Sequence, residues 1–503
     1  MIAVETVILI TVVAVLLVVF LAVGRKSDSV SKLPPGPFPW PFVGNVKQLR
    51  KLSQKLGGQH VALLELSRQY ASPVFKLRLG RNDTFVVSGK QGIHTVLNSE
   101  EYEGRPWNYF IRLRNMGKKK GITMNDGPEW RCIRSWFVRS MRSVGFARRE
   151  MSEYITEELE CILENIQDGG VRQMKQIIVP AIINVLWIFA AGKKFDQNKL
   201  QYFIDLMGRR AQAFDMTGGI LSAFPWIRHI APNYSGYNLL VTLNNEFKSI
   251  LTEIIDEHKK NFIAGTERDV IDMFLTEMYS GKGPETVFDD DQLVMILVDI
   301  LLAGLNITAT TLDFLFLTML INQDSQRLLH DEIDRVIGQD RLPNMNDKAN
   351  MPYLEAVILE SQRLAPVVPV IGPRRVLRDT ELLGYHIPRE SFVIINLHSI
   401  HADSELYPEP KLFKPERFLV EPHSSSRFRD DNLLFFGKGK RQCPGVALAK
   451  TALFLLFAGI MQRYEILPVP DQDPPSLRIN PGLTLSPKPY NVLLRMRKVN
   501  EPD

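Results

Sequence analysis

The stretch from Leu433 to Arg463 limits the possible folds of this chain more than any other. An apolar run, Leu433–Phe436, leads into a glycine-rich loop that ends at Cys443, and a helical pattern follows over Val446–Arg463. A cysteine at a helix N-terminus is biased toward the thiolate, because the terminal N–H groups and the helix dipole favour negative charge. The loop therefore indicates a metal-ligating thiolate. The plainer alternative is a small buried hydrophobe.

The spacing Phe436-x-x-Gly439-x-Arg441-x-Cys443-x-Gly445 favours the ligand. It resembles the haem-binding signature of the cytochrome P-450 superfamily at every defining position. The resemblance implies haem b with Cys443 as the axial iron ligand, and Phe436, Arg441 and Gly445 around the cofactor. Thiolate ligation helps to break an O–O bond. The implied fold is mainly α with small β-sheets, preceded by one N-terminal transmembrane helix.

The N-terminal residues predict that helix. Residues 7–23 are apolar except for Thr11, and with residues 2–4 they reach the roughly 20 residues that span a bilayer. Arg25 and Lys26 follow, and nothing basic precedes the run, so we expect an anchor over 2–24 with the following chain in the cytosol. A cleaved signal peptide is the alternative, but the run is long for one and lacks a basic start.

Closely spaced prolines follow the anchor. They fix φ and forbid a helix, so residues 25–45 are expected to form a stiff, basic and proline-rich hinge. A proline-rich recognition segment is the alternative. In microsomal cytochromes P-450, which this arrangement resembles, the hinge sets the attitude of the catalytic domain to the membrane. The motifs from Lys32 onward belong to one fold, so residues 46–503 are expected to be a single haem-thiolate domain.

Charge and cysteine content add two limits. The net charge of +5 indicates no particular partner, and we expect no nucleic acid. Three cysteines, Cys132, Cys161 and Cys443, give no disulfide framework, so the body is expected in a reducing compartment. The localisation that follows is the endoplasmic reticulum membrane, with the catalytic domain facing the cytosol.

Local patterns predict several other elements. A helix is expected over His60–Tyr70, and strands over Val74–Leu79, Thr84–Ser88, Arg375–Asp379 and Phe392–Asn396. The run Lys118-Lys119-Lys120 is expected to be solvated.

Trp130 and Arg134 are four residues apart and share one face of a predicted helix. By themselves they indicate a packing tryptophan with a surface arginine. The family pattern W-x-x-x-R implies instead a clamp on a haem propionate, with an indole N–H and a guanidinium as donors. Resemblance adds further propionate ligands, so the expected set is Arg105, Trp130, Arg134, Arg374 and Arg441.

The longest helical pattern is Asp289–Gln323, and its middle is apolar nearly all round, which predicts a buried helix. Ala303 and Gly304 lie at its centre. A glycine there costs roughly 1 kcal/mol relative to alanine, so it is expected to open room, either for dioxygen over the iron or for a close helix contact.

The family usually has an acid and an alcohol after this glycine, which organise water for O–O cleavage. Here Asn306 and Ile307 stand at those places, and Thr308 is rotated by about 100° from Ile307. Four outcomes stay open. A hydroxyl is borrowed from water or substrate; the substrate is itself a base, as in the plant amino-acid N-hydroxylases of the superfamily; the enzyme is an isomerase or dehydratase; or the haem protein is inactive.

Glu360 and Arg363 are three residues apart on a predicted helix over Tyr353–Leu364, and Pro415–Phe418 follows later in the chain. Such pairs are usually surface decoration. The spacing resembles the E-x-x-R and P-E-R-F elements of the family, which implies an inward ionic triad of Glu360, Arg363 and Arg417 behind the cysteine loop.

The resemblance covers nearly the whole chain after the anchor, and the body looks most like insect microsomal members. It implies a monooxygenase that uses O2 and electrons from NADPH-cytochrome P-450 reductase. Arg131, Arg139, Lys438 and Lys440 could dock that partner, or merely form a solvated face. The segments expected to contact substrate are largely apolar, which favours a small lipophilic or aromatic molecule. They are loop 107–122, the stretch near 213–225, Ile296–Ala303, Val367–Ile371 and the tail near Leu483.

Overall fold

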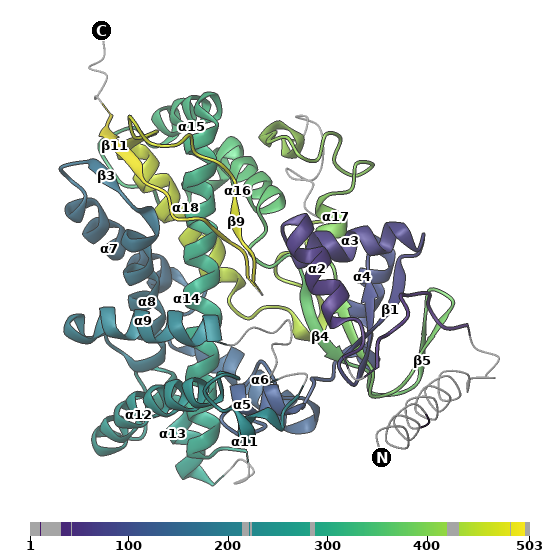
Figure 1. The fold of residues 1–503 in the computed structure, drawn as a ribbon. Helices are drawn as coiled ribbons and strands as arrows, with labels where there is room; N and C mark the ends of the chain where they lie inside the picture. The colour runs from purple at the N-terminus through teal and green to yellow at the C-terminus, as the bar shows by residue number, and fades with distance from the viewer. Residues whose placement is uncertain are drawn as a thin grey trace.

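The computed structural model describes residues 11, 32–41, 43–213, 221, 224–281, 287–419, 432–482 and 484–497 (Figure 1). The predicted anchor, except for Thr11, and Leu483 lie outside these residues. The larger helices are α2 (Val46–Leu56), α3 (Gln59–Gln69), α4 (Lys90–Asn98), α5 (Tyr109–Arg114), α6 (Gly127–Ser143), α7 (Arg149–Asn165), α8 (Met174–Ala191), α9 (Gln197–Ala213), α12 (Tyr237–Asn261), α13 (Val270–Ser280), α14 (Asp290–Ile321), α15 (Gln323–Val336), α16 (Pro352–Leu364) and α18 (Val446–Arg463). Short helices are α11 (Ile227–Ile230), α17 (His398–His401), η1 (Glu100–Tyr102), η2 (Asp347–Asn350), η3 (Pro415–Phe418) and η4 (Gly439–Arg441).

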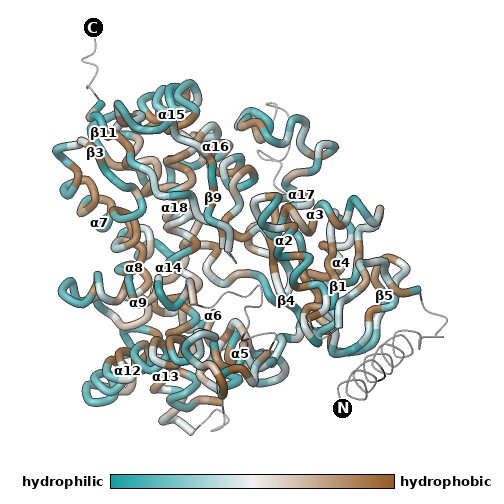
Figure 2. Tube along the Cα trace, viewed as in Figure 1, coloured by the Kyte–Doolittle hydropathy of each residue, from teal (hydrophilic) through white to brown (hydrophobic). Residues whose placement is uncertain are grey.

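The predicted long helix is α14, which runs through the middle of the helical part of the molecule (Figure 1). Its start is capped by Asp289, whose carboxylate accepts a hydrogen bond from the Gln292 amide at 2.8 Å. One large apolar core joins α14 to α8 and α18. Figure 2 shows α8 as largely hydrophobic and the outer helix α15 as largely hydrophilic. The inner helix α8 is therefore apolar, whereas the outer helix α15 is mostly polar.

Three described helices, α8, α14 and α18, are long and apolar enough to cross a membrane by length and composition alone. In each of them, 71 or 72% of the most apolar window is buried inside the protein. Packing in the core accounts for their apolar character.

The main sheet has the strand order β1-β2-β7-β4 and lies to one side of the helices with α2, α3 and α4 (Figure 1). Its strands are β1 (Val74–Leu79), β2 (Asn82–Val87), β4 (Ile371–Arg375) and β7 (Phe392–Ile395). The other strands are β3 (Gly170–Arg172), β5 (Thr380–Leu382), β6 (Tyr385–Ile387), β8 (Tyr464–Leu467), β9 (Ile479–Asn480), β10 (Ser486–Pro487) and β11 (Val492–Met496). The strand predicted over Arg375–Asp379 was placed too late in the chain. β4 ends at Arg375, because Arg375 already pairs with Phe392 at the start of β7.

The proline-rich segment is extended over residues 32–40 and lies against the domain. The Lys76 amide donates to the Pro35 carbonyl at 2.7 Å, and the His386 amide donates to the Lys32 carbonyl at 2.9 Å. A Cβ on Gly36 would lie 2.0 Å from the Lys76 carbonyl oxygen, so only glycine permits this approach. The end of the segment is thus fastened to the domain at two places.

Candidate functional site

The cysteine loop follows Phe436, passes through η4 and ends at the start of α18. Within it, the Cys443 amide donates to the Phe436 carbonyl at 2.9 Å. Gly439 has φ 72°, and a Cβ there would lie 2.4 Å from the Leu97 carbonyl oxygen of α4. Glycine is therefore required at 439 both for the backbone conformation and for the contact with α4.

Two opposing effects act on the Cys443 thiol. Desolvation raises its pKa, although the Gly445 amide and the charge of Arg134 act in the opposite direction. A metal cation at Sγ would deprotonate the thiol outright. Cys443 is nevertheless exposed, so a ligand can reach it.

Three of the predicted propionate ligands, Arg105, Arg374 and Arg441, form a cluster of like charges. Burial, together with the charges of Arg374 and Arg441, holds the pKa of Arg105 well below its usual range. Burial lowers the pKa of Arg374 to about 10, and burial and the Arg374 charge lower that of Arg441 to about 9. The buried Nε atoms of Arg105 and Arg374 have no hydrogen-bond partner. A cluster of this kind fits an anionic group such as a pair of haem propionates.

The two other predicted ligands, Trp130 and Arg134, and also Arg441, have donors that the protein already uses. The Trp130 indole N–H donates to the Ile122 carbonyl at 2.9 Å, and the Arg134 guanidinium donates to the Gln442 carbonyl. Arg441 donates to the carbonyls of Glu103 and Asn125. These side chains hold the cysteine loop and its neighbours together. The Arg441 guanidinium also lies 3.4 Å from the centroid of the Trp130 ring, so Trp130 supports Arg441 by stacking.

Sequence reasoning missed Asp126, which organises this region. Its carboxylate accepts from the Arg105 amide at 2.7 Å, from Arg375 at 2.8 Å and from Lys119 at 2.6 Å. Although burial raises the pKa of Asp126, these hydrogen bonds outweigh it and lower the value to about 2. The capping position of Asp126, directly before α6, was the available signal. Asp126 is shared with Arg375 and Lys119, so together with Glu103 it only partly offsets the positive charge of the Arg105 cluster.

The middle of α14 is open at Ala303, which is exposed although it lies in a buried helix. Gly304 faces the other way: a Cβ there would lie 2.6 Å from Leu186 of α8, so this glycine serves close helix packing. Asn306 and Ile307 are half-buried. The Thr310 hydroxyl, one turn further on, donates to the Asn306 side chain at 3.4 Å.

Thr308, predicted to lie off the iron-facing side, is buried. The loop Lys118–Lys120, predicted to be solvated, is partly exposed, and its lysines also pair with carboxylates: Lys118 with Asp291, Lys119 with Asp126 and Lys120 with Asp289. Lys440, placed on the predicted basic docking face, pairs with Glu100. Both basic groups are therefore partly neutralised.

The structure brings Glu360, Arg363 and Arg417 together. Arg363 donates to the two carboxylate oxygens of Glu360 at 2.7 and 2.8 Å, and Arg417 Nε donates to Glu360 at 3.0 Å. The remaining donors of Arg363 reach the carbonyls of His401, Pro410 and Leu412. The side chains of Glu360 and Arg363 are 0% and 1% exposed. Arg363 is closed to ligands, because its donors are all used within the protein. Arg417 keeps one buried nitrogen, Nη2, without a hydrogen-bond partner.

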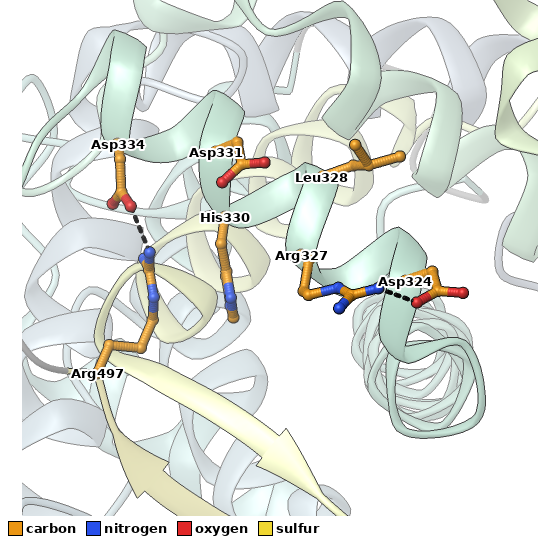
Figure 3. Close-up of a pocket in the computed structure, with 7 residues that line it drawn as sticks. All are labelled: Asp324, Arg327, Leu328, His330, Asp331, Asp334 and Arg497. Atoms are coloured by element: carbon orange, nitrogen blue, oxygen red, sulfur yellow. Dashed lines mark hydrogen bonds and ion pairs between the residues drawn. The ribbon is translucent and has the colours of Figure 1, made fainter.

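A separate surface pocket lies between α15 and the C-terminal tail (Figure 3). Asp334 pairs there with Arg497, and Asp324 with Arg327. None of the predicted site residues lines it.

Known proteins resemble the chain over almost its full length. A family model for cytochrome P-450 matches residues 34–494. A probable cytochrome P-450 305a1 of Drosophila melanogaster is 35% identical over 472 residues, which cover 91% of this chain and 93% of that protein. A farnesoate epoxidase of Bombyx mori is 36% identical over 473 residues, 92% and 94% of the two chains. Cytochrome P-450 2U1 of Mus musculus is 33% identical over 493 residues, 92% and 91% of the two chains.

Members of this family bind haem through a cysteine thiolate and are monooxygenases that take electrons from a redox partner. The exposed cysteine, the arginine cluster that fits an anion and the mainly helical fold agree with that cofactor. On the match over residues 34–494 and the identity to insect members, the chain belongs to the cytochrome P-450 family.

Proposed function

We propose that the chain is a membrane-bound monooxygenase that carries haem on Cys443 and oxidises a small lipophilic metabolite. The observation that supports this most directly is the cluster of Arg105, Arg374 and Arg441, which fits the haem propionates and lies in the same part of the structure as an exposed Cys443. Haem bound there would supply the oxygen-activating iron.

In this proposal each residue has a stated role. The Gly445 amide and Arg134 stabilise negative charge on Cys443 Sγ, since both lower the pKa of that thiol. Arg105 and Arg374 bind carboxylates with Nε donors that are otherwise unpaired. Ala303, with no polar atom in its side chain, leaves an open apolar surface on α14.

The rest of the proposal concerns placement and partners. Residues 2–24 anchor the chain in the endoplasmic reticulum membrane, residues 25–45 form the hinge, and residues 46–503 face the cytosol and accept electrons from NADPH-cytochrome P-450 reductase. Large apolar side chains are exposed at two separate segments, which supports contact with a lipid surface. They are Phe38, Trp40, Trp226, Ile230 and Tyr234.

The substrate is proposed to be a terpenoid-like molecule. The name of the Bombyx mori relative, farnesoate epoxidase, supports this class, and so does the apolar character of Ile296–Ala303 and Val367–Ile371. The proposed reaction adds one oxygen atom from O2 to the substrate and reduces the other to water, with two electrons from NADPH.

A second candidate is N-hydroxylation of an aromatic amino acid to an aldoxime. Asn306 and Ile307 carry neither an acid nor an alcohol, and the Thr310 hydroxyl bonds the Asn306 side chain. A substrate that is itself a base would, in its protonated form, supply the missing proton source. An isomerase or dehydratase is the third possibility, and it needs no reductase.

Turnover of the purified protein with reductase separates these functions. Farnesoate, phenylalanine and a sterol are incubated with and without NADPH and O2, with Cys443→Ser as the inactive control. An oxygenated product that requires both supports the monooxygenase, and an aldoxime from phenylalanine supports the second candidate. In that case Asn306→Glu with Ile307→Thr should lower the activity. A product formed without NADPH refutes both.

A further inference from the structure

A buried carboxylate on α14 has one oxygen without a hydrogen bond. Asp299 lies one turn before the exposed Ala303, on the same face of the helix, and its side chain is 4% exposed. Its Oδ2 accepts hydrogen bonds from the amides of Ile122 at 2.7 Å and Thr123 at 2.9 Å. Its Oδ1 is buried and has no hydrogen-bond partner. Such an atom carries a desolvation cost that a ligand donor could remove.

A guanidinium group lies beside this oxygen but does not bond it. Arg114 is the last residue of α5, and its NH2 is 3.9 Å from Asp299 Oδ1, which is an ion pair beyond hydrogen-bond distance. In the described part of the chain, its side chain donates one hydrogen bond, to Asn115 at 2.9 Å. Arginine has five N–H donors. Burial lowers the pKa of Arg114, although the charge of Asp299 opposes this.

A second guanidinium group, that of Arg210, adds positive charge beside Arg114. Arg210 of α9 is buried and holds the end of α5, with hydrogen bonds to the Arg114 carbonyl at 2.8 Å and to Asn244 at 3.0 Å. Burial and the Arg114 charge lower the pKa of Arg210 to about 9. The lysines of the adjoining loop pair with other carboxylates, as described above. Asp299 therefore faces the guanidinium groups of Arg114 and Arg210, and its charge also acts on Arg105.

The position of this pair suits the polar end of a substrate. Arg114 lies in loop 107–122 and Asp299 in Ile296–Ala303, two segments expected from the resemblance to contact substrate. One helical turn, about 5.4 Å, separates Asp299 from the open surface at Ala303. A molecule whose polar end reaches Arg114 can therefore extend its apolar part along α14.

Building on the proposed monooxygenase function, we propose that Arg114 binds a carboxylate of the substrate, so that the enzyme takes a small lipophilic carboxylic acid in preference to its ester. A guanidinium with free donors matches a carboxylate better than any neutral group. Two sources share this chemistry. A terpenoid acid offers the carboxylate alone, whereas an α-amino acid also offers an ammonium group for Asp299 Oδ1.

The test is equilibrium dialysis of the oxidised, haem-loaded protein without reductase, against farnesoate, methyl farnesoate, phenylalanine and phenylalanine methyl ester. At least one acid should bind at least tenfold more tightly than its ester. Arg114→Gln should weaken binding of that acid about tenfold to a hundredfold, because a hydrogen bond to a charged group is lost. Binding of the ester should not change. Arg209→Gln, at an exposed position of α9, is the matched control.

Asp299→Asn separates the two sources. It should leave farnesoate binding unchanged or tighter, since a nearby negative charge is removed, and it should weaken phenylalanine binding if the ammonium lies on Oδ1. The carbon monoxide spectrum of each reduced variant reports whether the haem site is intact. If Arg114→Gln does not fold, Arg114→Lys is used instead. It keeps the positive charge but loses the paired N–H donors of the guanidinium, so the loss of affinity for the acid should be smaller.

Two results overturn the proposal: neither acid binds more tightly than its ester, or Arg114→Gln weakens acid and ester equally. The outcome is independent of the proposed reaction, because binding needs neither electrons nor O2. A protein that binds the acids but forms no oxygenated product contradicts the monooxygenase and leaves the carboxylate site standing.

Discussion

Two groups of buried arginines in this molecule differ in how completely the protein satisfies them. Behind the cysteine loop, Arg363 is held by both oxygens of Glu360 and by backbone carbonyls. On the other side, Arg105 and Arg374 keep unpaired Nε atoms, and the charge of Arg374 helps to lower the pKa of Arg105. Arg363 and Arg374 are 1% and 2% exposed, so burial alone does not reveal function. The difference teaches that an arginine whose donors are all used supports the fold, whereas one that keeps an unpaired buried donor is a candidate to bind a ligand.

The strongest way to break this comparison is to remove Arg363. Arg363→Ala leaves Glu360 as a buried charge with one partner fewer, which should cost about 3–5 kcal/mol and prevent accumulation of a haem protein. The measurement is the red-shifted Soret band of the reduced carbon monoxide complex in purified material. Arg327→Ala is the control, because Arg327 and Asp324 are also three residues apart but exposed (Figure 3). The control should lose less than about 1 kcal/mol. Normal haem incorporation in Arg363→Ala would refute the structural role of the triad.

The cluster of Arg105, Arg374 and Arg441 should respond in the opposite way in the haem-free protein. Arg374→Gln removes one of three repelling charges, so the melting temperature of the haem-free protein should not fall. The haem-loaded protein should release haem roughly tenfold faster, since one charged hydrogen bond to a propionate is lost. Transfer of haem to an acceptor protein measures the rate. Arg378→Gln, an exposed neighbour that pairs with Glu101, is the control. An unchanged release rate would mean that Arg374 does not contact the cofactor.

A third cluster of buried charged groups extends the comparison of paired and unpaired charges, and its expected effect on stability is the smallest. His258, Asp269 and Asp272 lie close enough to hold a metal ion. However, the Arg268 guanidinium donates to the Asp272 carboxylate. His258 forms hydrogen bonds with both Asp269 at 3.2 Å and the Ile254 carbonyl at 2.8 Å. Because these groups are already paired, we expect chelators to have no effect on stability.

The same cluster gives a pH dependence. Burial lowers the pKa of His258, but hydrogen bonds to Asp269 and Ile254 outweigh it, so the pKa is raised above 6.5. Its contribution to stability is therefore complete below pH 6.5 and is lost as the pH rises through the raised value. His258→Gln should speed thermal inactivation at acidic pH and have little effect at alkaline pH. An equal effect at both would contradict the charged pair.

The sequence predicted the elements whose signals are local. Val446–Arg463 is helical as expected, and α14 begins and ends within two residues of its prediction, because apolar periodicity and the Asp289 cap are readable without tertiary context. The use of the Trp130 indole was not predictable, because its partner, the Ile122 carbonyl, lies in an irregular loop. The raised pKa of Cys443 could not be foreseen either, since desolvation depends on packing that no motif records. Asp299, the one acid within the apolar run Leu293–Leu305, was the readable sign of the pair with Arg114.

The fastening of the proline-rich segment has a consequence for how the protein is handled. The carbonyls of Lys32 and Pro35 accept hydrogen bonds from two different sheets, from His386 of β6 and Lys76 of β1, so this part of the segment is held against the domain. These two hydrogen bonds, together called the bracket below, restrict rotation of the domain relative to the segment. A shortened form that starts at Lys32 keeps the whole bracket, whereas one that starts after Pro35 loses both fasteners.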